Sequence, residues 1–116
     1  MNNAGSPQHK ETGVKSRYIA GAVALLLAAA THAQDAQALY SRSLAATCAA
    51  CHGTDGAAVP GSGAVPLAGM PKEYLATQMK AFKTGTRPAT VMHQLSKGYT
   101  DAQIDQLAAY FAGVKK

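Results

Sequence analysis

At 116 residues the chain is long enough for one domain, which excludes a large multidomain assembly. Its two cysteines allow one disulfide at most and exclude a disulfide-rich scaffold. The net charge of +5 is only mildly basic, and basic and aromatic residues are not interleaved, so we expect no nucleic-acid partner. A domain this short buries a limited core and often needs a bound group to stabilise it.

The N-terminal region has the layout of a bacterial secretory signal peptide. A basic head precedes an apolar run, residues 18–30, and Ala33 supplies a small residue at the cleavage position. The run is shorter than the roughly 20 residues of a transmembrane helix. We therefore expect residues 1–33 to be cleaved and residues 34–116 to form one periplasmic domain without a stable membrane anchor. A short anchor that is never cleaved is the alternative. The basic head consists of Lys10, Lys15 and Arg17.

Residues 35–50 contain neither glycine nor proline and are rich in alanine and leucine. Their periodicity predicts a helix that runs into the cysteines. Residues 53–66 contain several glycines and two prolines, Pro60 and Pro66, so we expect a loop that wraps a bound group. The residues at helical intervals in the first segment are Ala36, Leu39, Ser43 and Ala46.

Two further segments complete an all-α prediction. A helix begins near Pro71 and ends at Gly85, with an apolar stripe of Leu75, Met79 and Phe82. Residues 86–97, broken by Pro88, are expected to be an irregular connection. Thr100 and Gln103 then form a capping-box pattern at the start of the last helix. Its apolar stripe consists of Ile104, Leu107, Ala108, Phe111 and Val114.

The stretch Cys48-Ala-Ala-Cys51-His52 contains both cysteines of the chain. Residues three and four apart share one face of a helical turn, so two thiols and an imidazole converge there. This spacing is the attachment motif of c-type haem. We predict that Cys48 and Cys51 bind haem c covalently and that His52 ligates the iron. The carbonyl of Pro66 is our candidate acceptor for the other ring nitrogen of His52.

Three alternatives to haem attachment are weaker. A disulfide across two intervening residues would hardly constrain the unfolded chain. A structural zinc site needs four protein ligands, and the mature chain has one further histidine, His93. A thioredoxin-like dithiol would be expected in a βαβ unit, which this sequence does not predict.

An electron carrier keeps its iron six-coordinate, and methionine opposite histidine raises the reduction potential. Met79 belongs to a core stripe, and Met70 follows His52 closely on the proximal side. Met92 follows the intervening helix and can return across the opposite face, so we predict Met92 as the second axial ligand. Its neighbour His93 cannot point at the same iron, and we expect it to be exposed.

Three stretches resemble class I cytochromes c: CHGTDG (51–56), LAGMPKEYL (67–75) and KGYTDAQIDQLAAYFA (97–112). Two more, AFKTGTRPATVM (81–92) and LSKGYT (95–100), are similar to the cytochrome subunit of flavocytochrome c sulfide dehydrogenases. Together these stretches cover most of the predicted domain.

The resemblance implies a class I cytochrome c fold, with about four short helices wrapped around one haem whose apolar surface supplements a small core. It also implies Met92 as the distal ligand and a sulfide-oxidising flavoprotein as electron donor. The chain departs from the family's pattern just before Leu67, at His93 after Met92, and in having one haem domain where many flavocytochromes have two. The family generally has a proline two residues before the leucine at position 67, whereas here Pro66 stands immediately before Leu67.

The predicted function is one-electron transfer by a carrier that is not an enzyme on its own. The carrier is either the haem subunit of a sulfide dehydrogenase or a free shuttle to a terminal oxidase or reductase. A haem-based ligand sensor is a third alternative. Five basic residues are either a docking ring for an acidic partner or ordinary solvated side chains: Lys72, Lys80, Lys83, Arg87 and Lys97.

Overall fold

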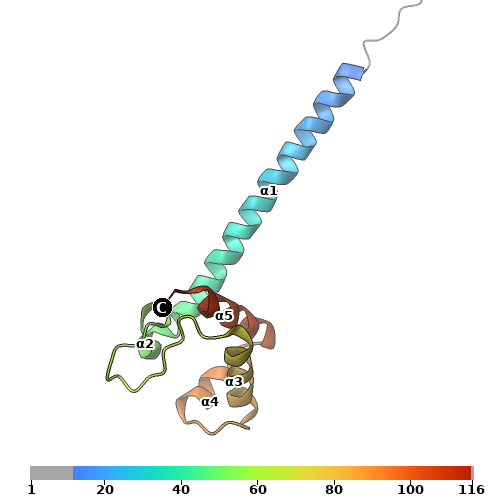
Figure 1. Cartoon of the computed structure of the whole chain (residues 1–116). Helices are drawn as coiled ribbons and strands as arrows, with labels where there is room; N and C mark the ends of the chain where they lie inside the picture. The colour runs from blue at the N-terminus through green and yellow to red at the C-terminus, as the bar shows by residue number, and fades with distance from the viewer. Residues whose placement is uncertain (1–11, 116) are drawn as a thin grey trace, which may run out of the picture. The chain divides into compact units, whose positions relative to one another are not determined.

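The computed structural model describes residues 12–115, and the side chains of residues 12–17 and 24–31 are outside that description. Every regular element in the described part of the chain is a helix, and no strand occurs there (Figure 1). The all-α prediction is therefore confirmed. The elements are α1 (Thr12–Ala46), α2 (Ala49–His52), the 3-10 helix η1 (Thr54–Gly56), α3 (Lys72–Thr84), α4 (Val91–Lys97) and α5 (Asp101–Gly113).

The chain divides into two compact units, residues 1–37 and 38–116. The described part of the first unit is the N-terminal portion of α1, on which Tyr18 is exposed. Among the described residues, no helix is both long and apolar enough to cross a membrane. Residues 1–11, the start of the expected signal peptide, lie outside the described residues, and cleavage after Ala33 stays a prediction.

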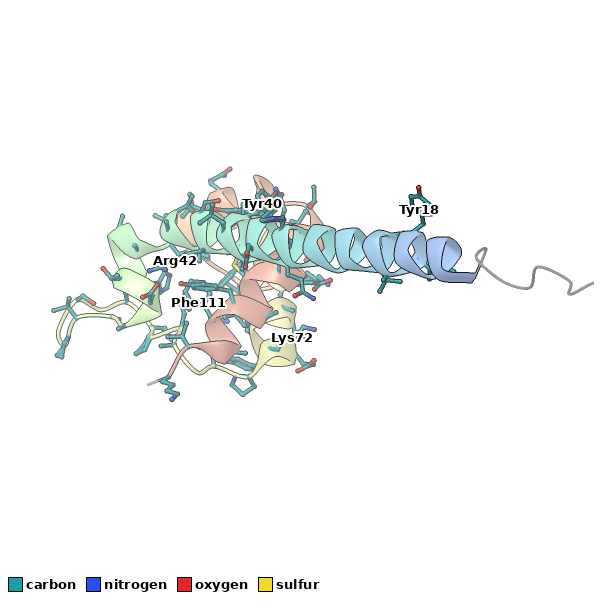
Figure 2. The ribbon with its side chains drawn as sticks, turned by 90° about the horizontal axis from the view of Figure 1, so that it is seen from above. Tyr18, Tyr40, Arg42, Lys72 and Phe111 are labelled. Atoms are coloured by element: carbon teal, nitrogen blue, oxygen red, sulfur yellow. The ribbon has the colours of Figure 1, made fainter. Side chains whose placement is uncertain are left out.

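The core of the second unit is built on α5. Phe111 is buried on this helix (Figure 2), and α3 packs against both α5 and α4. The predicted stripes are largely confirmed, although α5 ends at Gly113, before Val114. Burying these apolar side chains supplies the main stabilisation of the unit. The core side chains are Ala45, Leu75, Met79, Ile104, Leu107, Ala108 and Phe111.

The junction between α4 and α5 is hydrogen-bonded to α1. The predicted capping box is present, with Gln103 N donating to Thr100 Oγ1 at 3.2 Å and Thr100 N donating to Gln103 Oε1 at 2.9 Å. Gln103 Nε2 also donates to the hydroxyl of Tyr40 on α1 at 2.9 Å. Tyr99 Oη lies 2.6 Å from Thr47 Oγ1. The Thr47 hydroxyl donates its own proton to a carbonyl of α1 at 2.7 Å, so it accepts the hydrogen bond from the Tyr99 hydroxyl.

Two features of α1 differ from prediction. The helix ends at Ala46, and Thr47 and Cys48 form a turn before α2, whereas a continuous helix was expected. The predicted apolar face is also wrong, because Leu39 is 71% exposed while Ala45 is buried. Alanines occur on several faces of this segment, so periodicity alone does not identify the buried one.

The prediction that residues 86–97 are irregular is wrong, because Val91–Lys97 form α4. Seven residues are too few to show a clear helical period. Thr90, at the N-cap, makes no side-chain capping bond that would mark the start. So short a helix is unstable alone and depends on packing against α3. Met92 therefore lies in the first turn of a helix.

Candidate haem attachment site

The attachment motif occupies one short turn. Cys48 precedes α2 as its N-cap, and its carbonyl accepts from Cys51 N at 3.3 Å and from His52 N at 2.9 Å. Both thiols are free, and Cys48 packs against the core while Cys51 is exposed. Burial raises the pKa of the Cys48 thiol above its ordinary value, and the hydrogen bond with Thr47 opposes this effect.

His52 is oriented by a backbone carbonyl. Its Nδ1 lies 2.7 Å from the carbonyl oxygen of Val65. A carbonyl only accepts, so Nδ1 carries the proton and Nε2 is left with a lone pair for a metal. The prediction of Pro66 as the acceptor is wrong by one residue. The acceptor is two residues before Leu67, the position at which the family generally has its proline.

The loop returns to His52 because both its ends meet at Gly56. The Gly56 carbonyl accepts from Leu67 N at 2.8 Å and from Ala68 N at 3.2 Å. Proline restricts the residue before it to extended conformations, so Pro66 limits the backbone of Val65 to such a conformation. The acceptor carbonyl is thus positioned without a proline at position 65.

Glycines are required on the C-terminal side of α2. Gly53 has a φ of 78°, and a Cβ there would lie 2.2 Å from the carbonyl oxygen of Ala57. Gly56 has a φ of 76°, and its Cβ would lie 2.9 Å from side-chain atoms of Leu67 and Phe111. Both positions therefore exclude other residues for steric and conformational reasons.

Asp55 connects this turn to α5. It is the one non-glycine residue with positive φ, 53°, among the described residues. Its Oδ1 accepts from Tyr110 Oη at 2.6 Å, and this bond raises the pKa of the Tyr110 hydroxyl. The tyrosine thus stabilises a backbone conformation that aspartate tolerates better than most residues.

The three candidate methionines differ in position. Met79 is 9% exposed in the core, as predicted. Met70 and Met92 are both half-buried and contact the edge of the core. Ligation by Met92 stays a prediction. His93 is half-buried rather than exposed, and its Nδ1 lies 2.7 Å from the carbonyl oxygen of Phe82 on α3.

Three of the five basic residues interact within the chain. Lys80 pairs with Asp105 and Lys83 pairs with Asp101, each at 2.7 Å. The Arg87 guanidinium lies 4.6 Å from the centre of the Phe82 ring. Lys72, exposed at the start of α3 (Figure 2), and Lys97 have no ion pair among the described residues. Of the five residues in the expected docking ring, only Lys72 and Lys97 are therefore without an interaction of this kind in the described region.

The residues of the turn fit a c-type haem. Two free thiols at the required spacing are followed at once by an imidazole whose Nδ1 proton is already bonded and whose Nε2 is free. No three His, Cys, Asp or Glu side chains in the described region gather to hold a metal ion by themselves. Sequence reasoning missed Val65, Tyr99 and Tyr110, whose contacts join residues far apart in the chain.

The helical fold and this turn define a carrier of covalently bound haem, and the family comparison agrees. The family model for cytochrome c matches residues 33–115. The chain belongs to the cytochrome c family, which indicates covalent haem c, and Cys48 and Cys51 stand at the spacing of the attachment motif. The class I fold expected from the sequence is confirmed.

Three known proteins are similar in sequence to this chain. The "Thiosulfate dehydrogenase electron acceptor" of Thiomonas intermedia is 42% identical over 71 residues, which cover 61% of this chain and 33% of that protein. The "Cytochrome subunit of sulfide dehydrogenase" of Chlorobaculum tepidum is 42% identical over 74 residues, or 63% of this chain and 64% of the relative. "Cytochrome c4" of Pseudomonas aeruginosa is 39% identical over 78 residues, or 67% and 38%.

The matched region spans about a third of the first relative and just under two thirds of the second. The names of these relatives describe electron carriers or cytochrome subunits, consistent with a carrier that is not an enzyme by itself.

Proposed function

We propose that the mature chain is an exported monohaem cytochrome c that transfers one electron at a time between redox proteins. Cys48 and Cys51 anchor the haem, and His52 and Met92 are its axial ligands. The observation that carries the proposal is the bond between His52 Nδ1 and the Val65 carbonyl, since it leaves Nε2 free beside two free thiols. Family membership supports the same assignment.

Bound haem supplies a one-electron ferric and ferrous couple. The chain tunes this couple through its own residues. Donation from His52 Nδ1 to Val65 orients the imidazole and strengthens it as a ligand. A Met92 thioether would favour the ferrous state and raise the potential. The buried side chains of α3 and α5 belong to the core against which Cys48 and Met92 pack.

We further propose a flavoprotein that oxidises sulfide as the electron donor. The similarity to the Chlorobaculum tepidum subunit supports this choice, because the match covers most of both chains. A free shuttle is the second candidate, and the similarity to an electron acceptor of thiosulfate dehydrogenase favours it. Of the five basic residues named above, Lys72 and Lys97 form no ion pair within the described region and could contact an acidic partner.

Purification from the native periplasm tests both export and partnership. We expect the tagged chain in the periplasmic fraction, shortened by residues 1–33 and carrying one haem. Flavin in stoichiometric amount with a co-purifying larger chain would support the flavocytochrome, and sulfide should then reduce the haem. Haem without flavin would contradict it and favour the shuttle. Retention of the chain in the cytoplasm would contradict export.

Carbon monoxide separates the electron carrier from a ligand sensor. A firm methionine ligand blocks the iron, so we expect slow and incomplete binding of carbon monoxide to the reduced protein at neutral pH. Rapid, complete binding would favour a sensor with a labile distal position.

A further inference from the structure

His93 contacts the C-terminal end of α3. Its Nδ1 lies 2.7 Å from the carbonyl oxygen of Phe82, and the imidazole is the donor because a carbonyl only accepts. Phe82 lies in the last turn of α3, where its carbonyl also accepts from Gly85 N at 3.2 Å, so His93 is a second donor to this carbonyl. His93 therefore caps α3 from the neighbouring helix α4.

A second contact holds the same ring. Gly85 ends α3 in the left-handed conformation, with a φ of 81°. A Cβ at this position would lie 3.0 Å from His93 Cε1, closer than ordinary van der Waals contact. The imidazole thus occupies the space that the glycine leaves open. The hydrogen bond and this packing contact together fix the ring against α3.

The backbone of Met92 is held from within α4. Ser96 is fully buried, and its hydroxyl donates to the Met92 carbonyl at 2.6 Å. Consecutive residues of an α-helix point about 100° apart. A fixed His93 side chain therefore determines the direction in which the neighbouring Met92 side chain leaves α4.

We propose that His93 is a positioning residue for Met92. By fixing α4 on α3, it holds the Met92 thioether in one direction and keeps its own imidazole away from the iron. This inference rests on the proposed role of Met92 as axial ligand. A tertiary contact matters here because α4 has seven residues and its N-cap supplies no side-chain capping bond. A helix this short needs tertiary contacts to keep its orientation.

The test compares holoprotein variants His93→Ala and Gln94→Ala with the wild type. Gln94 is the exposed neighbour on α4 and serves as the matched control. The first readout is the far-red absorption band of thioether-ligated ferric haem, followed on heating. The second is the rate at which carbon monoxide binds the ferrous protein. We expect His93→Ala to lose the band at lower temperature and to bind carbon monoxide about fivefold faster or more. Gln94→Ala should match the wild type.

One outcome is a wild type that shows the band and a His93→Ala variant that keeps both the same thermal loss of the band and the same rate of carbon monoxide binding. This result would overturn the positioning role of His93 alone. A wild type without the band would overturn Met92 ligation as well. His93→Gln, whose amide can donate to Phe82, should recover part of the wild-type behaviour. No recovery, with the fold intact by circular dichroism, would contradict the hydrogen-bond account.

A double-mutant cycle that combines Gly85→Ala with His93→Ala tests the packing contact between these two residues. Positive-φ strain at position 85 occurs with either residue at position 93 and cancels in the cycle. We expect Gly85→Ala to destabilise the band in the presence of His93 and to have less effect in its absence. Equal effects in both backgrounds would show that Gly85 and His93 act independently and would overturn the packing contact.

Discussion

The two sides of the proposed haem site are built differently. On the proximal side, the cysteines and His52 lie in one turn, and a loop closed at Gly56 returns the Val65 carbonyl to the imidazole. On the distal side, Met92 lies on a seven-residue helix held by contacts with α3 and by the buried hydroxyl of Ser96. Local chain geometry defines the first side, and tertiary contacts define the second. Proximal residues are therefore easier to identify from sequence.

Loss of covalent attachment should have the largest effect. We expect the double variant Cys48→Ser, Cys51→Ser to bind no haem covalently and to retain little tertiary order, because the haem supplies apolar surface that a short chain lacks. Thermal unfolding followed by circular dichroism should become broad. Cooperative unfolding equal to that of the holoprotein would show that both sides of the site form without haem.

Gly56→Ala should have the next largest effect, on the proximal side. The added methyl group would meet Leu67 and Phe111 at 2.9 Å in a left-handed backbone conformation. Strain and overpacking together predict a loss of about 2 to 4 kcal/mol in unfolding free energy. Gly61→Ala is the matched control, because its φ is 85° and no atom lies within 4 Å. It should cost about 1 kcal/mol. Equal losses would show that loop closure at Gly56 does not require close packing.

Pro66→Ala tests how the proximal carbonyl is held. Without the proline, Val65 gains conformational freedom, which should cost about 0.5 to 1 kcal/mol. The hydrogen bond from His52 Nδ1 to the Val65 carbonyl should weaken. The imidazole should then be a weaker electron-donating ligand to the iron, which should raise the reduction potential. Potentiometry and the exchange rate of the Nδ1 proton would measure this. Pro60→Ala, in the same loop, should leave the potential unchanged. A shift of equal size in Pro60→Ala would indicate a general effect of loop mobility.

The ion pair between Lys83 and Asp101 should have the smallest effect. The hydrogen bond from Lys83, with its charge, holds the pKa of Asp101 below its ordinary value. Because the folded pKa is lowered, the stabilisation is present above the unfolded carboxyl pKa of about 3.9 and is lost as pH falls through the folded pKa.

Asp101→Asn should therefore be slightly less stable than the wild type at neutral pH, and the difference should shrink in acid. Unfolding midpoints between neutral and acidic pH would show it. Glu73→Gln is the control, since Glu73 also lies in the first turn of a helix and forms no ion pair within the described region. A larger effect for Glu73→Gln would assign the stabilisation to the helix dipole instead.

Several patterns that are local in sequence were predicted correctly, although the buried face of α1 and the helix α4 were not. The capping box of Thr100 and Gln103 spans four residues, and the attachment turn spans five. The stripe that places Met79 in the core also repeats within one helix. Each depends on helical spacing, which sequence displays directly.

Features that depend on distant contacts were missed or misplaced. Tyr99 and Thr47 are 52 residues apart, and His93 reaches Phe82 from another helix. The carbonyl of Val65 is selected by loop closure at Gly56, which no spacing rule reveals. Such contacts follow from the packed fold rather than from local propensity.

Comparison of Met92→Ala with Met70→Ala tests the central claim most directly, because both methionines are half-buried at the edge of the same core. The measurement is the far-red band of the ferric holoprotein. We predict that Met92→Ala abolishes the band and admits carbon monoxide to the reduced iron, while Met70→Ala retains the band. A band that persists in Met92→Ala, or that disappears only in Met70→Ala, would contradict Met92 as the distal ligand.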